Sequence, residues 1–185
     1  MEWVARDAKR AADVIHSVRG LVRKVDVHKI VLDLNEVIDE TKALLDRELT
    51  AQHVTLRLSL GRDIPQVMGD RVQIQQVVIN LIMNAVEAMQ VVSVRPPVLL
   101  VSSFYEEHRG VTVSVKDNGV GILDETRSRV FDPFFSTKPG GLGIGLSICR
   151  SIVEDHDGRL SASNNGGEPG STFEFTLAPI RNSLT

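Results

Sequence analysis

The sequence is short of several features that mark common protein classes. It has one cysteine, Cys149, in 185 residues, which excludes an internal disulfide framework and a multi-cysteine metal site. A single thiol fits a reducing, cytoplasmic compartment. No apolar run approaches the roughly 20 residues that a membrane-spanning helix needs, and the N-terminal stretch MEWVARDAKRAADVIHSVRG is charged throughout instead of carrying a signal-peptide core. We therefore expect a cytoplasmic chain that itself makes no membrane contact, with any membrane anchor elsewhere in a longer parent.

The chain also lacks a large excess of charge of either sign. The net charge of -3 gives no reason to expect a nucleic-acid partner. Hydrophobic residues make up 42% of the chain and charged residues 24%, a balance typical of a globular core. The length suits one domain of ordinary size with a short appendage, and the sequence shows no internal repeat.

Hydrophobic periodicity places the expected helices and strands in separate blocks. Helices are expected at about 2–25, 36–52, 70–90 and 144–156, and strands at about 54–60, 98–104, 111–115, 159–164 and 171–177. Asn35 is the expected N-cap of the second helix, Gly158 is expected to end the last one, and His156 is expected to be a satisfied structural histidine. Residues 61–69 and 118–143 have the composition of loops. The pattern favours an α+β fold, a two-layer sandwich in which helices cover one face of a mixed β-sheet after an N-terminal helix.

The stretch NLIMNAVEAM in the third helix is unusual, because amide side chains are costly to bury without partners. On a helical wheel the apolar residues fill one broad half, while Gln73, Asn80, Asn84 and Glu87 form a stripe only about 60° wide on the other side. An ordinary solvated face is one interpretation. Solvated faces favour Lys, Glu and Arg, however, so amides without a lysine indicate directed hydrogen bonding or a hard cation such as magnesium.

Two glycine motifs follow this helix. DNGVGI, at residues 117–122, comes directly after an expected strand, so that Asp117 can accept a hydrogen bond from an amino group; alone, the pattern also fits a simple turn. GGLGIGL, at residues 140–146, runs directly into a helix and places bare backbone N–H groups at its N-terminus, where phosphates bind. It is not a P-loop, because no G-K-[ST] follows. A flexible loop with a helix start is the alternative.

Between the two motifs, the segment FDPFFSTK at residues 131–138 holds three of the six phenylalanines beside Ser136, Thr137 and Lys138. Aromatic rings next to polar residues predict a segment that packs part of the time, as a lid over a ligand does. Lys138 would then reach a terminal phosphate, although an ordinary anchored loop is the alternative.

In this order the four motifs resemble the N, G1, F and G2 boxes of bacterial sensor histidine kinases. These belong to the wider family of ATP-binding domains shared with gyrase, the Hsp90 chaperones and MutL. The resemblance runs from about residue 30 to 177, and DRVQIQQVVINLIMNAVEAM with FFSTKPGGLGIGLSICRSIVEDH is most similar to PAS-linked FixL-like and NtrB-like kinases. It implies a catalytic and ATP-binding domain of the Bergerat fold at residues 27–180. Residues 1–26 would be a helical stub, the end of a dimerisation and phosphoacceptor hairpin.

The resemblance also implies roles for individual residues, with ATP and Mg2+ as cofactors. Asn84 would be the magnesium ligand, Asn80 would lie beside it near the phosphates, and these two form the implied catalytic set with Lys138. Asp117 would hold the adenine amino group, and Thr172 would lie at the back of the adenine site. The residues implied to bind the nucleotide are Asn84, Glu87, Asp117, Gly119, Gly121, Ile122, Phe131, Phe134, Thr137, Lys138, Gly141, Leu142, Gly143, Ile144, Gly145, Leu146 and Thr172.

In ATP-hydrolysing relatives, a glutamate that activates water stands four residues before the magnesium asparagine. That position is Asn80 here, and an amide cannot take a proton from water at neutral pH. The site is therefore expected to hold MgATP without hydrolysing it, as a phosphoryl donor must. We expect Glu87 to be a supporting or surface group, and Phe131 and Phe134 to be hinges of the lid.

A sensor kinase also needs an acceptor histidine, which in this family is followed directly by Glu or Asp. His16, in VIHSVRG, is followed by Ser17 and Val18, so we do not expect it to be the acceptor. We expect the chain to be a fragment that binds MgATP without appreciable autophosphorylation. Its expected partners are the acceptor hairpin of the parent, a second copy of the full-length parent, and the receiver domain of a response regulator.

Other functions remain open on the sequence alone. An ATPase clamp of the gyrase or chaperone type is disfavoured by Asn80. A nucleotide-free interaction module derived from a kinase is disfavoured by the intact Asn84, Asp117 and glycine loop. A serine kinase that acts on a partner, like the anti-sigma factors that share this ATP fold, is the remaining alternative.

Overall fold

A computed structural model describes residues 28–138 and 141–180, so the expected helix at 2–25 lies outside the described residues. The elements in chain order are β1 (Ile30–Leu32), α2 (Leu34–Ala51), β2 (Thr55–Leu60), β3 (Val67–Gly69), α3 (Arg71–Gln90), β4 (Val98–Glu106), β5 (Gly110–Asp117), the short 3-10 helix η1 (Arg127–Arg129), α4 (Gly145–Asp155), β6 (Arg159–Asn164) and β7 (Ser171–Leu177).

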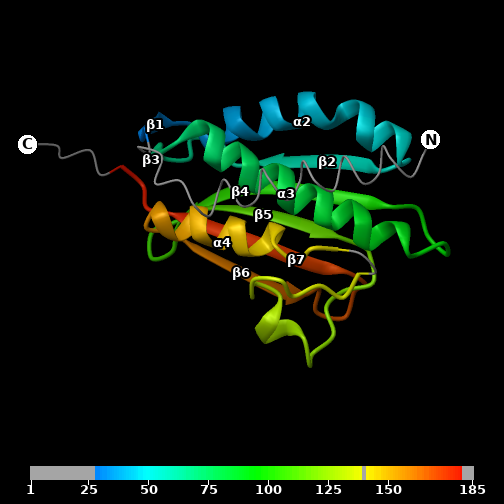
Figure 1. Ribbon diagram of the computed structural model, residues 1–185. Coiled ribbons are helices and arrows are strands. Elements are labelled where there is room, and N and C mark those ends of the chain that lie inside the picture. Colours follow the sequence, from blue (N-terminus) through cyan, green and yellow to red (C-terminus); the bar gives the residue numbers. More distant parts are fainter. Residues whose placement is uncertain (1–27, 139–140, 181–185) are drawn as a thin grey trace, which may run out of the picture.

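Five of the strands form one mixed sheet in the order β2–β4–β5–β7–β6. β2 runs parallel to β4, and the other neighbours are antiparallel, with β6 and β7 forming the expected closing hairpin. The helices α2, α3 and α4 lie side by side on one face of this sheet (Figure 1). The expected α+β sandwich with a mixed sheet is confirmed.

The core lies between these helices and the sheet. α3 is the central helix, and its inward side chains are fully buried: Ile74, Val77, Val78, Leu81, Ile82, Ala85, Val86 and Met89. They share one hydrophobic core with Val113 and Val115 of β5 and Phe175 of β7. Burial of one such side chain contributes about 1.5–3 kcal/mol. Because this half of α3 is committed to the core, the polar stripe faces away from it.

Two element boundaries differ from expectation near the start of the domain. The N-cap of α2 is Asp33 rather than Asn35, since the Asp33 carboxylate accepts a hydrogen bond from the backbone N–H of Asn35 at 2.8 Å. The side chain of Asn35 instead joins α2 to the sheet, donating to the oxygen of Gly61 and accepting from the hydroxyl of Ser103. The expected loop at 61–69 contains β3, which pairs with β1 and is too short to show an alternating pattern.

The end of α4 also differs from expectation. The left-handed residue after the helix is Asp157, with φ of 56°, rather than Gly158. Glycine is required at position 158 for another reason: a Cβ there would lie 2.3 Å from the backbone oxygen of Thr176 in β7. The chain can therefore enter β6 close against β7 only with glycine at this position.

His156 connects the end of α4 to the start of α3. Its Nε2 accepts a hydrogen bond from the backbone N–H of Asp70 at 2.9 Å, and its Nδ1 lies 2.7 Å from the oxygen of Ile152. Both ring nitrogens are used, so the expectation of a satisfied structural histidine is confirmed. Asp70 is also the N-cap of α3, and its side chain accepts from the N–H of Gln73. These bonds fix the N-terminal end of the helix that carries the asparagines.

Candidate functional site

Asp117, the last residue of β5, is only 2% exposed, and its carboxylate has three hydrogen-bond donors. Oδ1 accepts from the backbone N–H of Gly119 at 2.7 Å and from that of Ser171 at 3.3 Å, while Oδ2 accepts from the hydroxyl of Ser171 at 2.7 Å. A carboxylate has about four acceptor positions in all. The side chain is therefore held in one orientation and retains capacity for a further donor, such as an amino group of a ligand.

The glycines around Asp117 allow a close approach of backbones. A Cβ on Gly119 would lie 2.7 Å from the backbone oxygen of Ala88 in α3. A Cβ on Gly170 would lie 2.1 Å from the backbone oxygen of Asp117, and Gly121 has φ of +76°. Larger residues would push the DNGVGI loop away from α3 and from the start of β7. The structure thus brings the loop, α3 and β7 together around the buried carboxylate.

Two asparagines that the sequence did not single out support the same loop. Asn164 makes two hydrogen bonds of 2.7 Å with the backbone of Ile122, one to its N–H and one to its oxygen. Asn165 donates to the backbone oxygen of Asp117 at 2.7 Å and accepts from the hydroxyl of Thr172 at 2.6 Å. The hydroxyl that contacts the Asp117 carboxylate is that of Ser171, which the sequence did not single out, while the place of Thr172 at the back of the adenine site stays a prediction. Alternation along β7 accounts for the contact with Ser171, because neighbouring residues of a strand point to opposite faces.

Arg95 is a further supporting residue that the sequence did not reveal. It lies between α3 and β4, and its Nε and Nη2 donate to the backbone oxygens of Asn118 and Gly119 at 2.6 and 2.7 Å. The Asn118 side chain in turn bonds to the backbone of Pro96 and Val98. No periodicity marks a single arginine in a loop, so this clamp on the DNGVGI loop could not be found without the tertiary structure.

The polar stripe of α3 meets the lid at Lys138. The Lys138 ammonium lies 3.3 Å from Oδ1 of Asn84 and forms an ion pair with the carboxylate of Glu87. Asn84 and Glu87 are three residues apart and so share one face of the helix. The structure therefore brings together three of the residues that the sequence predicted to share a site, from segments more than 50 residues apart.

Asn80 has different surroundings. It lies near the thiol of Cys149, which is buried in α4 and whose Sγ is 4.0 Å from the backbone oxygen of Val77 in α3. Burial raises the pKa of Cys149 from 9.0 to about 12, and the neighbouring Asn80 amide acts in the opposite direction. Asn80 thus lies where α3 and α4 meet, and an amide there needs no counter-charge, whereas a carboxylate would.

The lid segment, which we define as residues 131–138, is anchored by aromatic contacts. Phe131 meets Phe173 of β7 edge to face, with ring centroids 6.2 Å apart, and Phe135 lies under the guanidinium of Arg129 at 4.5 Å. Phe134 is 78% exposed and has φ of +64°, a strained conformation for a non-glycine residue. Phe131 and Phe135 therefore hold the segment, while Phe134 projects from it.

The glycine-rich loop that follows the lid segment packs back against this segment. Gly143 has φ of +67°, and a Cβ there would lie 2.4 Å from the backbone oxygen of Phe135. A Cβ on Gly141 would lie 2.5 Å from Oγ of Ser136. These two glycines let the loop follow the lid closely. Gly140, the first glycine of the motif, lies outside the described residues.

The loop leads into the N-terminus of α4. Ile144 is the N-cap and has no side-chain capping bond, so the first-turn N–H groups of α4 have no capping side chain. A Cβ on Gly145 would have no neighbour within 4 Å, which leaves open space above this turn. Ile144 and Leu146 pack on the core, while Leu142 and Thr137 are exposed. The arrangement leaves helix N–H groups available to an anion.

A metal ion at this place would depend on few protein ligands. Within residues 28–138 and 141–180, no three His, Cys, Asp or Glu side chains are grouped so that they could hold a metal ion. The Asn84 amide oxygen already accepts from a cation, the Lys138 ammonium, which shows that it is turned toward a place where positive charge is accommodated. This donor set fits magnesium, which binds one or two protein oxygens and takes the rest from phosphates and water.

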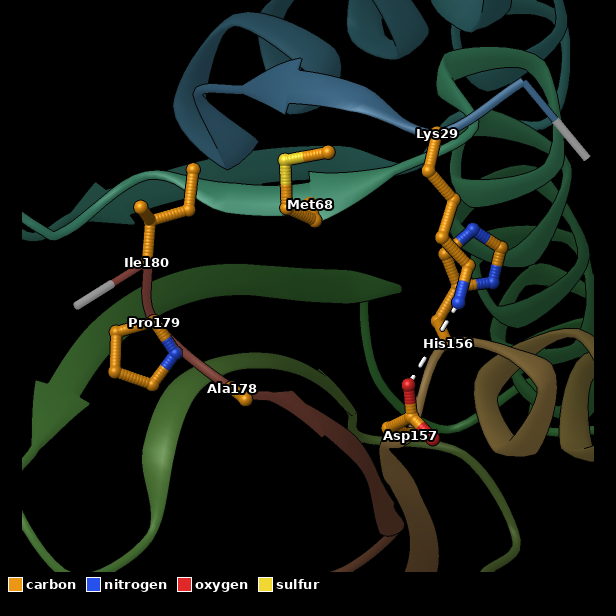
Figure 2. A pocket seen from close by; sticks show the side chains of 7 residues that line it. All are labelled: Lys29, Met68, His156, Asp157, Ala178, Pro179 and Ile180. Carbon is orange, nitrogen blue, oxygen red and sulfur yellow. Dashed lines mark ion pairs between the residues drawn. The ribbon is translucent and has the colours of Figure 1, made fainter.

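A separate cavity of about 360 Å³ lies at the other end of α3 (Figure 2). Its lining residues are Lys29, Met68, His156, Asp157, Ala178, Pro179 and Ile180. Among them, the Lys29 ammonium lies 3.7 Å from the carboxylate of Asp157. From Asp70 to Asn84 is about 20 Å along the helix, so this cavity is not part of the site around Asp117 and Asn84.

The fold and the site together define a class of protein. Its features are a mixed sheet covered by helices, a buried aspartate, a helix that carries two asparagines, and a glycine-rich loop that leads into a helix. Comparison with known families supports the same class. Residues 69–181 match the family described as histidine kinase-, DNA gyrase B-, and HSP90-like ATPase. The chain belongs to this family. None of the helices in the described part of the chain is long and apolar enough to cross a membrane.

Within the family, the similar proteins are sensor kinases. The chain is 40% identical over 177 residues to the sensor protein FixL of Bradyrhizobium diazoefficiens, covering 96% of this chain and 34% of that protein. It is 38% identical over 169 residues to the sensor protein TdiS of Thauera aromatica, covering 91% of this chain and 31% of that one. The chain thus spans about a third of the length of these relatives.

Among solved structures, the catalytic domain of the histidine kinase ThkA is similar with a TM-score of 0.71 at 33% identity, covering 82% of this chain and 96% of that one. ThkA in complex with the response regulator protein TrrA is similar with a TM-score of 0.78 at 27% identity, covering 98% of this chain and 51% of that one. The fold and the resemblance to sensor histidine kinases expected from the four motifs are confirmed.

Proposed function

We propose that this chain is the ATP-binding catalytic domain of a two-component sensor histidine kinase, with the domain proper at residues 27–180. It would donate the γ-phosphoryl group of MgATP to a histidine on a dimerisation hairpin, for relay to an aspartate of a response-regulator receiver domain. The observation that carries this proposal is the contact between Lys138 of the lid and Asn84 of α3. It joins the residue proposed for the terminal phosphate to the residue proposed for the metal.

The adenine end of the site would be read by Asp117. Its carboxylate is fixed by Gly119 and Ser171 and keeps acceptor capacity, so it can accept from the 6-amino group of adenine. Guanine carries an oxygen at that position and would place two acceptors against each other. The same carboxylate therefore supports selection of ATP over GTP, because bound GTP would leave buried polar groups without hydrogen-bond partners.

The phosphate end would be held by backbone groups and one cation-binding amide. The first-turn N–H groups of α4 and the bare backbone at Gly141, Gly143 and Gly145 can donate to phosphate oxygens. Asn84 would hold Mg2+ through its amide oxygen, and the metal, when bound, would neutralise charge on the phosphates. Lys138 would add a positive charge at the terminal phosphate once it leaves Asn84.

Asn80 supports a phosphoryl donor rather than an ATPase. Its amide has no basic atom with which to take a proton from water. Transfer to an acceptor side chain would then be favoured over hydrolysis. We expect no appreciable autophosphorylation of the chain by itself, and we expect the acceptor to be supplied by the hairpin of a dimeric parent in the cytoplasm. His16 lies outside the described residues.

The proposed base specificity gives a direct test. Calorimetric titration with a non-hydrolysable ATP analogue and with the corresponding GTP analogue, both with magnesium, should show binding of the first and at least 100-fold weaker binding of the second. Equal affinity for the two would argue against Asp117 as the adenine contact. Steady release of phosphate from ATP, lost in Asn84→Ala, would favour an ATPase instead.

A further inference from the structure

The contact between the lid and α3 has one cation and two acceptors. The Lys138 ammonium donates to Oδ1 of Asn84 at 3.3 Å and is paired with the carboxylate of Glu87. An ammonium has three donors, so it can serve both acceptors at once. Asn84 is neutral, and therefore the attraction that keeps the ammonium at this place comes from Glu87.

This arrangement conflicts with binding of a nucleotide to the same conformation. Asn84 cannot give its oxygen to a metal ion while an ammonium occupies that side of it, because two cations would then lie at one acceptor. Lys138 likewise cannot reach a phosphate while it is paired with Glu87. The nucleotide-free contact must therefore be exchanged when MgATP arrives.

We infer that Glu87 is a positioning residue for the lid: without nucleotide it holds Lys138 over Asn84, and it releases Lys138 when MgATP takes the Asn84 oxygen. This rests on the proposed function for its second half, while the first half concerns the nucleotide-free chain alone. Phe131 and Phe135 anchor the lid segment near its start and middle, and the Lys138 contact holds its end. Arg129 and Asp132 form an ion pair of 3.9 Å near the start of the lid, whereas the Lys138 pair joins the end of the lid to α3.

The strength of the contact suits a reversible role. The side chains of Lys138 and Glu87 are 41% and 55% exposed, so water and salt screen the pair. Exposed pairs of this kind change equilibria by about two- to five-fold. A buried pair would resist exchange, whereas this one can be displaced by a doubly charged metal ion and a phosphate. The effect of Glu87 should accordingly be modest and dependent on ionic strength.

Hydrogen exchange of the lid amides tests the first half without any nucleotide. In the nucleotide-free chain, Glu87→Gln should speed exchange at residues 131–138 by about two- to five-fold at low salt. The unaltered chain should approach the rates of the variant at high salt. Glu107→Gln, an exposed glutamate in the turn between β4 and β5, is the matched control and should change nothing at the lid.

A double-mutant cycle shows whether Glu87 acts through Lys138. In a Lys138→Met background, Glu87→Gln should have no further effect on hydrogen exchange in the lid. Any effect of Glu87→Gln on affinity for the ATP analogue should also be smaller in that background than in the unaltered chain. Lid amides that exchange at unfolded-peptide rates in the unaltered chain, or an equal effect of Glu87→Gln with and without Lys138, would overturn the inference. Absence of nucleotide binding with the expected lid behaviour would instead overturn the proposed function.

Discussion

Ser171 holds the buried carboxylate of Asp117 with both its side chain and its backbone. Its hydroxyl donates to Oδ2 at 2.7 Å and its N–H to Oδ1 at 3.3 Å, across 54 residues of sequence. The two residues stand at the ends of neighbouring antiparallel strands, β5 and β7. The register of these two strands therefore determines the orientation of the Asp117 carboxylate.

Ser171→Ala should weaken binding of the ATP analogue and destabilise the domain. It leaves one carboxylate oxygen of Asp117 without its hydroxyl donor, which costs about 1–3 kcal/mol. Calorimetry and urea denaturation measure the two effects. Ser163→Ala, at an exposed position of β6, is the control and should be silent. If Ser171→Ala changed neither the affinity for the ATP analogue nor the stability, the hydroxyl would not support the carboxylate.

Arg95→Ala should loosen the DNGVGI loop. The loss of two charged hydrogen bonds to backbone oxygens should cost about 1–3 kcal/mol in stability, and analogue affinity should fall although Arg95 itself needs no contact with the ligand. Arg150→Ala, which removes only an exposed pair with Glu154, should change stability by less than about 1 kcal/mol. Equal effects of the two substitutions would contradict a clamp at Arg95.

Two glycines of one motif should respond differently to alanine. Gly143→Ala forces a Cβ to within 2.4 Å of the Phe135 oxygen at φ of +67°, so it should cost about 1–3 kcal/mol or displace the lid. Gly145→Ala meets no neighbour within 4 Å and begins a helix, so it should be neutral or slightly stabilising. Thermal denaturation and lid hydrogen exchange compare the pair. The same result for both would argue against this loop geometry.

Cys149 should make stability fall at alkaline pH. Its pKa is about 12 in the folded chain against 9.0 ordinarily, because the thiolate is disfavoured by burial. Below pH 9 the thiol is protonated in both states and contributes no pH dependence. Between pH 9 and 12 only the unfolded chain loses this proton, so the free energy of unfolding should fall by about 1.4 kcal/mol per pH unit.

Comparison with Cys149→Ala separates the contribution of this thiol from every other cause of a change in stability at alkaline pH. The slope between pH 9 and 11 should be smaller in the variant by about 1.4 kcal/mol per unit, whatever its stability at neutral pH. Identical slopes would mean that the thiol is not buried in the folded chain.

Much of the site could be predicted because its residue types recur at fixed spacing. Asn80 and Asn84 fall on one helix face, and the glycines of the two motifs are needed where backbones approach closely. Such features depend on the geometry of a single helix or loop, so the spacing of residues in the sequence is enough to predict them. The fold class followed from periodicity in the same way.

The remaining features depend on tertiary pairing. Ser171 and Thr172 are adjacent, and only the register of β7 decides which one faces Asp117. Asp33 and Asn35 are both good N-caps, and the choice depends on Asn35 being drawn to Gly61 and Ser103. Arg95 carries no local signal at all.

The most direct test of the nucleotide site is calorimetric titration of the chain with a non-hydrolysable ATP analogue, with and without magnesium. Asp117→Asn should abolish binding, because an amide in place of the carboxylate presents a donor where acceptors are needed, while Asp39→Asn on the exposed face of α2 should leave it unchanged. Micromolar binding that magnesium strengthens and that only Asp117→Asn removes is the predicted result. No binding to the unaltered chain, or equal binding to Asp117→Asn, would contradict the nucleotide site.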